Sequence, residues 1–280
     1  MKSFAKKFLR HRVALASLVF LAVVSVGAGF APVFTRQSYE VQNIEEKLET
    51  PNAQHWMGTD TLGRDLYSRV VYGARMSLSV GVITALLSLT VGTLVGAIAG
   101  YRGGKIDAAL MRVVDVFYIF PSLLIAILLT VYFGRGFLGI LVAITLTSWV
   151  THARLVRNLV LQSKEMLYVE SARSLGLSGT RILLRHILPN ILGPMIVSLT
   201  FQIPTNIMSE SFLSFIGLGL EPPYSSWGTL ANEGFRAMKS FPHLILFPGT
   251  VLFVTLLAFN ALGDGVRDVL DPRGKRDFGA

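Results

Sequence analysis

Residues 76–101 read MSLSVGVITALLSLTVGTLVGAIAGY, a stretch without one charged side chain. A helix rises about 1.5 Å per residue, so about 20 apolar residues are needed to cross about 30 Å of hydrocarbon. Backbone polar groups in lipid must be satisfied within the segment, so this stretch predicts a membrane-spanning helix. Gly92, Gly96 and Gly100 repeat every four residues within it. That repeat favours close approach of another helix, although glycine is also simply tolerated in membrane helices.

Five more stretches have the same character: residues 13–34, 116–134, 136–153, 186–209 and 240–263. Charged residues make up only 15% of the 280-residue chain, against roughly 25% in soluble proteins. The sequence therefore predicts an all-α polytopic membrane protein with six transmembrane helices. We expect kinks or close packing at the prolines inside these stretches, which are Pro121, Pro194, Pro204 and Pro248.

The chain begins with a basic segment, because residues 1–12 hold five Lys or Arg ahead of the first apolar stretch. A secretory signal peptide has this order of features, but its apolar part is only about 7–15 residues long. We therefore expect an anchor that stays in the membrane. We also expect two units: residues 1–75, with the tail, the first helix and an outer amphipathic segment, and residues 76–280, a five-helix core with a cytoplasmic loop at 154–188.

Basic residues are unevenly distributed between the two faces that six spans would define. The face of both termini carries 18 of the 26 Lys and Arg residues. By the positive-inside rule this face is cytoplasmic, so both termini are expected inside the cell, in a multi-pass protein of the cell (inner) membrane. The same topology explains the formal net charge of +9 without any nucleic acid partner.

Residues 60–74, just before the second span, have an amphipathic helical pattern. We expect Asp65 and Arg69 to form an ion pair one turn apart on this helix. A structural collar is the favoured interpretation, because the oxygen spacing of a calcium loop is absent. The apolar face of the expected helix carries Leu62, Leu66 and Val70.

The loop between the fourth and fifth spans, residues 154–185, is the most informative segment. It holds six basic and two acidic residues, and it is far longer than two neighbouring helices require. The pattern predicts two short helices: Gly176 ends the first in the left-handed conformation, and Ser178 or Thr180 caps the second. A helical hairpin lying on the lipid surface is the alternative to a surface that binds a partner.

The second short helix is expected to end at Pro189, where the next span begins. Its charged side is predicted to present Arg181 and Arg185. Its apolar side is predicted to consist of Leu184, Ile187 and Leu188.

The loop resembles the EAA loop of permease subunits of ATP-binding-cassette (ABC) importers, whose pattern is Glu-Ala-Ala, three residues, Gly, nine residues, Ile-x-Leu-Pro. Ser171 stands here for the second-position Ala, and His186 for the Ile. The other pattern positions are matched by Glu170, Ala172, Gly176, Leu188 and Pro189.

Further patches are similar to the second (C-type) permease of dipeptide and oligopeptide importers, a family that also includes nickel permeases. They cover most of the chain after residue 57. These patches are residues 58–65, Arg112 with Asp115 and Pro121, residues 185–190, residues 214–219, Pro222-Pro223 with Trp227-Gly228, Gly263-Asp264, Arg267-Asp268 and residues 270–273.

The resemblance implies the type I ABC importer permease fold and a coupling helix, residues 164–188, that docks in a groove of a cytoplasmic ATPase subunit. In that family Glu170 would accept a hydrogen bond from a basic group of the ATPase, and Gly176 would set the bend. The implied interface residues are Glu170, Ser171, Ala172, Gly176, Arg181, Arg185, Leu188 and Pro189.

The resemblance also implies partners: a second permease that completes a heterodimer in the lipid bilayer, two cytoplasmic ATP-binding subunits and an extracytoplasmic substrate-binding protein. No catalysis, cofactor or metal is expected on this chain. Gly104-Lys105 lacks the glycine and hydroxyl positions of a phosphate loop, so ATP would be handled by the partners. The cargo stays open between peptides, nickel and other small solutes.

Glu210 is the acid that we expect at membrane depth, because 24 uncharged residues precede it. It is either a translocation-path residue or a structural acid paired at the outer interface. The alternative interpretation, a secondary transporter driven by an ion gradient, is supported by this residue alone. An intramembrane hydrolase would need a nucleophile and a base, for which Ser148 and His152 are the nearest pair.

Overall fold

The computed structural model describes Phe8, Leu9 and residues 11–270, and this part of the chain folds into helices without a β-strand. Residues 1–7 of the basic segment and residues 271–273 of the tail patch lie outside the described residues. The membrane-spanning elements are α2 (Arg12–Gly29), α4 (Leu66–Arg102), α5 (Gly104–Ile119) with α6 (Ser122–Phe133), α7 (Phe137–Lys164), the continuous segment Gly179–Leu218, and α12 (His243–Leu270).

The segment Gly179–Leu218 contains two wider, π-helical turns. It consists of α9 (Gly179–Ile182), the π-turn η2 (Leu183–Ile187), α10 (Leu188–Leu213) and the π-turn η3 (Ser214–Leu218). The remaining elements are short: α3 (Ala31–Phe34), the 3-10 turn η1 (Ile44–Glu46), α8 (Leu167–Ser174) and α11 (Trp227–Ala237).

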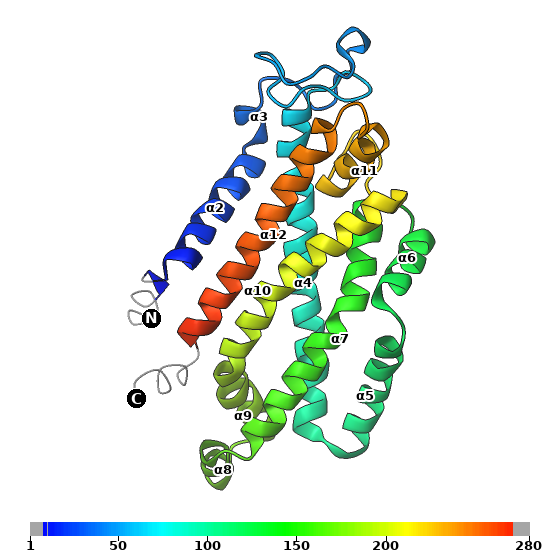
Figure 1. The fold of residues 1–280 in the computed structure, drawn as a ribbon. Helices are drawn as coiled ribbons and strands as arrows, with labels where there is room; N and C mark the ends of the chain where they lie inside the picture. Colours follow the sequence, from blue (N-terminus) through cyan, green and yellow to red (C-terminus); the bar gives the residue numbers. More distant parts are fainter. Residues whose placement is uncertain (1–7, 10, 271–280) are drawn as a thin grey trace.

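The long helices lie side by side in a bundle, with α4 near its centre in contact with α2, α7 and α10 (Figure 1). The start of α2 and the end of α12 lie at the same end of the bundle as α8, which we call the elbow end. Residues 35–65 and α11 lie at the opposite end, which we call the loop end. Within the described residues, five helical segments are long and apolar enough to cross a membrane, and the bent pair α5–α6 makes a sixth when it is counted as one span, in agreement with the six predicted spans.

Gly92, Gly96 and Gly100 of α4 lie against α7. A Cβ atom on Gly96 would stand 2.4 Å from the carbonyl oxygen of Ala153, and one on Gly92 would stand 2.5 Å from the Cβ of His152. Neither distance leaves room for a methyl group, so the helix backbones approach as closely as the absent side chains allow. The close-packing interpretation of the glycine repeat is therefore confirmed.

The third apolar stretch is not one straight helix. Helix α5 ends at Ile119, Phe120 and Pro121 are extended, and α6 leaves at 90° to α5. Proline lacks the N–H of a helical hydrogen bond and disfavours helical geometry in the residue before it, here Phe120. A kink was expected at Pro121, but the structure has a complete break.

The expected amphipathic helix at residues 60–74 is only partly correct. Helix α4 begins at Leu66 and runs without interruption to Arg102, so residues 66–74 are the first turns of the second span. The predicted Asp65–Arg69 ion pair is wrong, because Asp65 is the N-cap of α4 and accepts a hydrogen bond from the Ser68 N–H at 2.7 Å. The end of a helix leaves N–H groups unsatisfied, and a carboxylate there satisfies one of them.

The predicted division at residue 75 falls inside α4, where the helix is continuous. The backbone therefore has no break at residue 75. The division into residues 1–75 and 76–280 stays a prediction.

Candidate functional site

Helix α8 and its turn form a compact projection at the elbow end, residues 165–182, which we call the elbow (Figure 1). Gly176 follows α8 with a φ of +78°, and its N–H donates to the Arg173 carbonyl at 3.0 Å. The next N–H, of Leu177, donates to the Ala172 carbonyl at 3.2 Å, so the last turn of α8 is closed by hydrogen bonds. The predicted left-handed stop at Gly176 is confirmed.

One face of the elbow is buried against the bundle. Val169 and Ala172 of α8 pack in one apolar cluster with Val160 of α7 and with Ile182 and Ile187, which precede α10. Val169, Val160 and Ile187 have no solvent exposure. Burial of such side chains stabilises by about 1.5–3 kcal/mol each. The elbow is therefore fixed to both α7 and α10, and a force on α8 reaches two spans.

The opposite face of the elbow is exposed and mixed in character. Leu167 and Leu175 are 79% and 81% exposed. Glu170 and Ser171 lie on the same exposed surface. Glu170 makes no ion pair with any described residue.

The basic residues of this loop fall into two groups. Arg154 pairs with Asp115 at 2.6 Å, Arg157 pairs with Asp107 at 2.5 Å, and the Lys164 ammonium donates to the Tyr101 carbonyl at 3.0 Å. These three contacts brace α7 against α4 and α5. The second group has no ion pair within the described part of the chain and is exposed; it consists of Arg173, Arg181 and Arg185.

The second elbow helix differs from the prediction. It does not end at Pro189, because α9, η2 and α10 form one continuous helix. Its predicted apolar face is partly correct: Ile187 is buried, but Leu184 is 59% exposed and Ile182 takes its place in the apolar cluster. The cause is the π-turn, in which residues five apart share a face. Proline has no N–H for the regular pattern, and the Leu188 N–H just before it bonds back five residues to Leu183.

The remaining predicted interface residues lie around this turn. Pro189 is exposed and Leu188 is half-buried beside the apolar cluster. His186, at the position where the EAA pattern has Ile, is half-buried, and its carbonyl accepts from the Asn190 side chain at 2.9 Å. The side chain of Ala172, by contrast, is buried against other residues of this chain. The assignment of all these residues to an interface stays a prediction.

Glu210 lies inside the chain, with no solvent exposure. Its carboxylate accepts hydrogen bonds from Ser214 at 2.7 Å, Ser77 at 3.0 Å and Ser211 at 3.4 Å. The Ser77 hydroxyl also accepts from the Trp227 N–H at 3.2 Å, which joins α10, α4 and α11. Hydroxyl donors thus surround this acid, and its role in translocation stays a prediction.

The Ser148 and His152 side chains do not meet. Ser148 donates to the Ile144 carbonyl at 2.6 Å, and the ring of His152 contacts Ser198 at 3.1 Å. The hydrolase alternative therefore lacks its nucleophile–base hydrogen bond.

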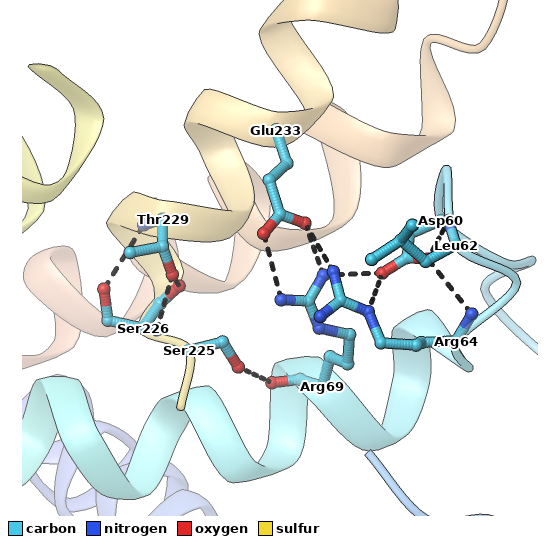
Figure 2. Close-up of polar contacts among 8 residues, drawn as sticks. All are labelled: Asp60, Leu62, Arg64, Arg69, Ser225, Ser226, Thr229 and Glu233. Atoms are coloured by element: carbon cyan, nitrogen blue, oxygen red, sulfur yellow. Dashed lines mark hydrogen bonds and ion pairs between the residues drawn. The ribbon is translucent and has the colours of Figure 1, made fainter. Parts of the chain in front are cut away.

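The loop end contains a buried ion cluster that the sequence did not reveal. Figure 2 shows Asp60, Arg64, Arg69 and Glu233 in mutual contact. The Asp60 carboxylate is 2.6 Å from Arg64 and 2.7 Å from Arg69, and both arginines also contact Glu233 of α11. The cluster ties the turn before α4 to α11. The acids and bases at 60–69 were visible, but Glu233 stands 164 residues beyond Arg69, so no local pattern could connect them.

Two family models match the chain. The model described as "Binding-protein-dependent transport system inner membrane component" matches residues 92–276. The model described as "N-terminal TM domain of oligopeptide transport permease C" matches residues 1–51.

Curated relatives match almost the full chain. It is 41% identical to the oligopeptide transport system permease protein OppC of Bacillus subtilis, over 95% of this chain and 88% of the relative. It is 43% identical to the dipeptide transport system permease protein DppC of the same species, over 97% and 85%. It is 39% identical to the glutathione transport system permease protein GsiD of Pectobacterium atrosepticum, over 98% and 91%.

A solved structure of the MetNI methionine ABC transporter in an inward-facing conformation has the same fold. The TM-score is 0.61 at 18% identity, covering 73% of this chain and 97% of that chain. The expected type I importer fold is thus confirmed. The chain belongs to the family of binding-protein-dependent transport system inner membrane components, the membrane-spanning permeases of ABC importers.

Proposed function

We propose that this chain is one of two permeases that together form a pathway for peptide import. The relatives named above are permeases of oligopeptide, dipeptide and glutathione systems, which share peptide chemistry. A substrate-binding protein would deliver the peptide, and two ATP-binding subunits would drive transport. This chain would make and break no covalent bond.

The elbow is the observation that carries the coupling part of this proposal. Its inner face is packed into the apolar cluster that joins α7 and α10. Its outer face exposes two leucines together with Glu170, Arg173 and Arg181, which make no ion pair with any described residue. A groove in an ATPase subunit would receive this mixed surface. Movement of that groove on ATP binding would then shift α7 and α10 together. A shift of packed helices of this kind can move a bundle from one arrangement to another.

The orientation follows from charge. The elbow end would face the cytoplasm, because the start of α2, the end of α12 and the unpaired Arg173, Arg181 and Arg185 lie there. Since the chain has no cysteine, Ser178→Cys gives a single label site in the elbow. A membrane-impermeant maleimide should leave it unlabelled in intact cells and label it in inverted vesicles. Labelling of intact cells from outside would contradict this orientation and place the elbow on the outer face of the membrane.

Reconstitution tests the function itself. Vesicles containing both permeases and both ATPase subunits, with the binding protein outside, should accumulate a labelled tripeptide only when ATP is supplied at the ATPase side. Omission of the ATPase subunits should abolish uptake. Peptide movement by this chain alone, without nucleotide, would contradict the proposal and favour a gradient-driven carrier.

A further inference from the structure

Two neighbouring hollows lie toward the loop end. The larger, of about 590 Å³, is bounded by Arg75 and Met76 of α4, by Phe137 at the start of α7, and by Leu220, Glu221 and Tyr224 after η3. The smaller, of about 320 Å³, shares Arg75, Met76 and Tyr224 with it and adds Tyr39 and Tyr72. Ligand sites in proteins commonly enclose about 300–1,000 Å³. Arg75 therefore stands on the wall between two spaces of suitable size.

Arg75 differs from the two arginines that precede it. Arg64 and Arg69 are buried and pair with Asp60 and Glu233. Arg75 is exposed and makes no ion pair or side-chain hydrogen bond with any described residue. Arg64, just before α4, and Arg69 within it thus stabilise the fold through ion pairs, whereas Arg75 of α4 faces an open space.

Glu221 supplies the opposite charge on the same wall. It is exposed, and it too has no ion pair or side-chain hydrogen bond within the part of the chain that the structure describes. Although both residues line the larger hollow, they do not pair with each other. One unpaired cation and one unpaired anion are therefore held apart around a single cavity.

Aromatic rings line both hollows: Tyr224 borders each of them, and Tyr39 and Tyr72 border the smaller one. Tyr39 and Tyr72 are stacked with their centroids 4.1 Å apart, and Tyr224 is 53% exposed. A hydrogen bond with Glu40 raises the pKa of Tyr39 to about 12, and its phenol is uncharged at neutral pH, as that of an ordinary tyrosine is. Neutral aromatic faces of this kind accommodate varied side chains without demanding one charge.

We propose that the larger hollow binds the two charged ends of a short peptide, with Arg75 holding the terminal carboxylate and Glu221 the terminal ammonium. This inference rests on the proposed function and adds to it the part of the substrate that this chain would bind, namely the charged termini of the peptide. A guanidinium group matches a carboxylate with two parallel hydrogen bonds. Two or three extended residues span about 7–10 Å, which fits a cavity of about 590 Å³. The remaining wall of the larger hollow, with Tyr224, Phe137 and Leu220, carries no further charge and leaves the side chains of the peptide unselected.

The experiment compares three peptides in the complete reconstituted transporter with the binding protein in excess: trialanine, its C-terminal amide and its N-acetyl derivative. Arg75→Gln should lower the uptake ratio of trialanine to the amide by about tenfold or more, while the ratio to the N-acetyl peptide stays as in wild type. Glu221→Gln should do the reverse. Because every variant uses the same binding protein, a change in these ratios originates in the permease. Arg236→Gln, an exposed cation at the loop end outside the hollow, is the matched control and should change neither ratio.

Equal loss of all three peptides with Arg75→Gln, at unchanged ratios, would overturn the inference and identify Arg75 as a contact to a partner subunit. Should that variant fail to assemble, Arg75→Lys and Glu221→Gln carry the test, and unchanged ratios in both would likewise overturn it. In each of these outcomes wild-type uptake still supports the proposed function. Absence of peptide uptake by the wild-type transporter would instead refute the proposed function, and this inference with it.

Discussion

Two sets of charged residues, one at each end of the bundle, differ in whether they have partners within the described part of the chain. At the loop end, Asp60, Arg64 and Arg69 are at most 5% exposed and pair with one another or with Glu233. At the elbow end, Glu170 and the arginines of α8 and α9 are exposed and pair with no described residue. The buried, paired residues of the loop end therefore stabilise this chain, whereas the exposed, unpaired residues of the elbow end are available to bind another chain.

The comparison predicts its largest effect on stability at Arg69. Arg69→Ala leaves the buried Asp60 and Glu233 of α11 with Arg64 as the remaining cation of the cluster. Removal of one member of a buried ion pair costs about 3–5 kcal/mol. A loss of this size lowers the unfolding midpoint by about 6–20 °C in a chain of this length, which thermal unfolding of the purified protein in detergent measures.

The exposed Arg236 of α11 is the matched control, and Arg236→Ala should shift the midpoint little. Similar unfolding midpoints for Arg69→Ala and Arg236→Ala would contradict the stabilising role of the buried cluster, because its arginine would then contribute no more to stability than a surface arginine.

A smaller effect is expected at Gly176. With φ at +78°, an alanine at this position is strained by about 1–2 kcal/mol, although no atom lies within 4 Å of the added Cβ. Relief of that strain changes the angle between α8 and α9. We expect Gly176→Ala to reduce retention of the ATPase subunits on the purified permease more than it reduces thermal stability.

Gly193 offers the control, since its Cβ would also meet nothing within 4 Å but it lies inside the regular helix α10. Gly193→Ala should keep the ATPase subunits bound, because alanine favours helix. If both alanine variants retain the ATPase equally, the bend at Gly176 is not part of the coupling surface.

The smallest effect on stability is expected at Glu170. Glu170→Gln changes an exposed side chain without an intrachain ion pair, so the free energy of unfolding should stay within about 0.5 kcal/mol. Loss of a charge-assisted hydrogen bond to the ATPase should nevertheless weaken its binding about tenfold or more. Titration of the ATPase subunit onto immobilised permease checks this, with the exposed loop-end residue in Glu45→Gln as control.

Much of the fold follows from the sequence because the bilayer excludes charge over a fixed length. Uncharged stretches therefore located the spans, and the Gly92–Gly96–Gly100 repeat identified the contact between α4 and α7. The stop at Gly176 was equally local, since only glycine adopts its φ without strain.

Other features depend on residues distant in the sequence or on backbone irregularities. The cluster of Asp60, Arg69 and Glu233 forms only after α11 folds back over α4. The π-turn before Pro189 shifts the buried positions to Ile182 and Ile187, which a regular 3.6-residue period places on different faces. Arg75 and Glu221 were each visible, but nothing in the sequence placed them at one cavity.

The most direct test of the account is contact between the elbow and an ATPase subunit. Ser171→Cys, in a chain that has no other cysteine, can carry a photo-crosslinker on the exposed face of α8. In the assembled transporter we predict a crosslink to the ATPase from position 171 and none from Glu45→Cys at the loop end. A crosslink to the ATPase from position 45, with none from position 171, would contradict the assignment of the elbow as the coupling surface.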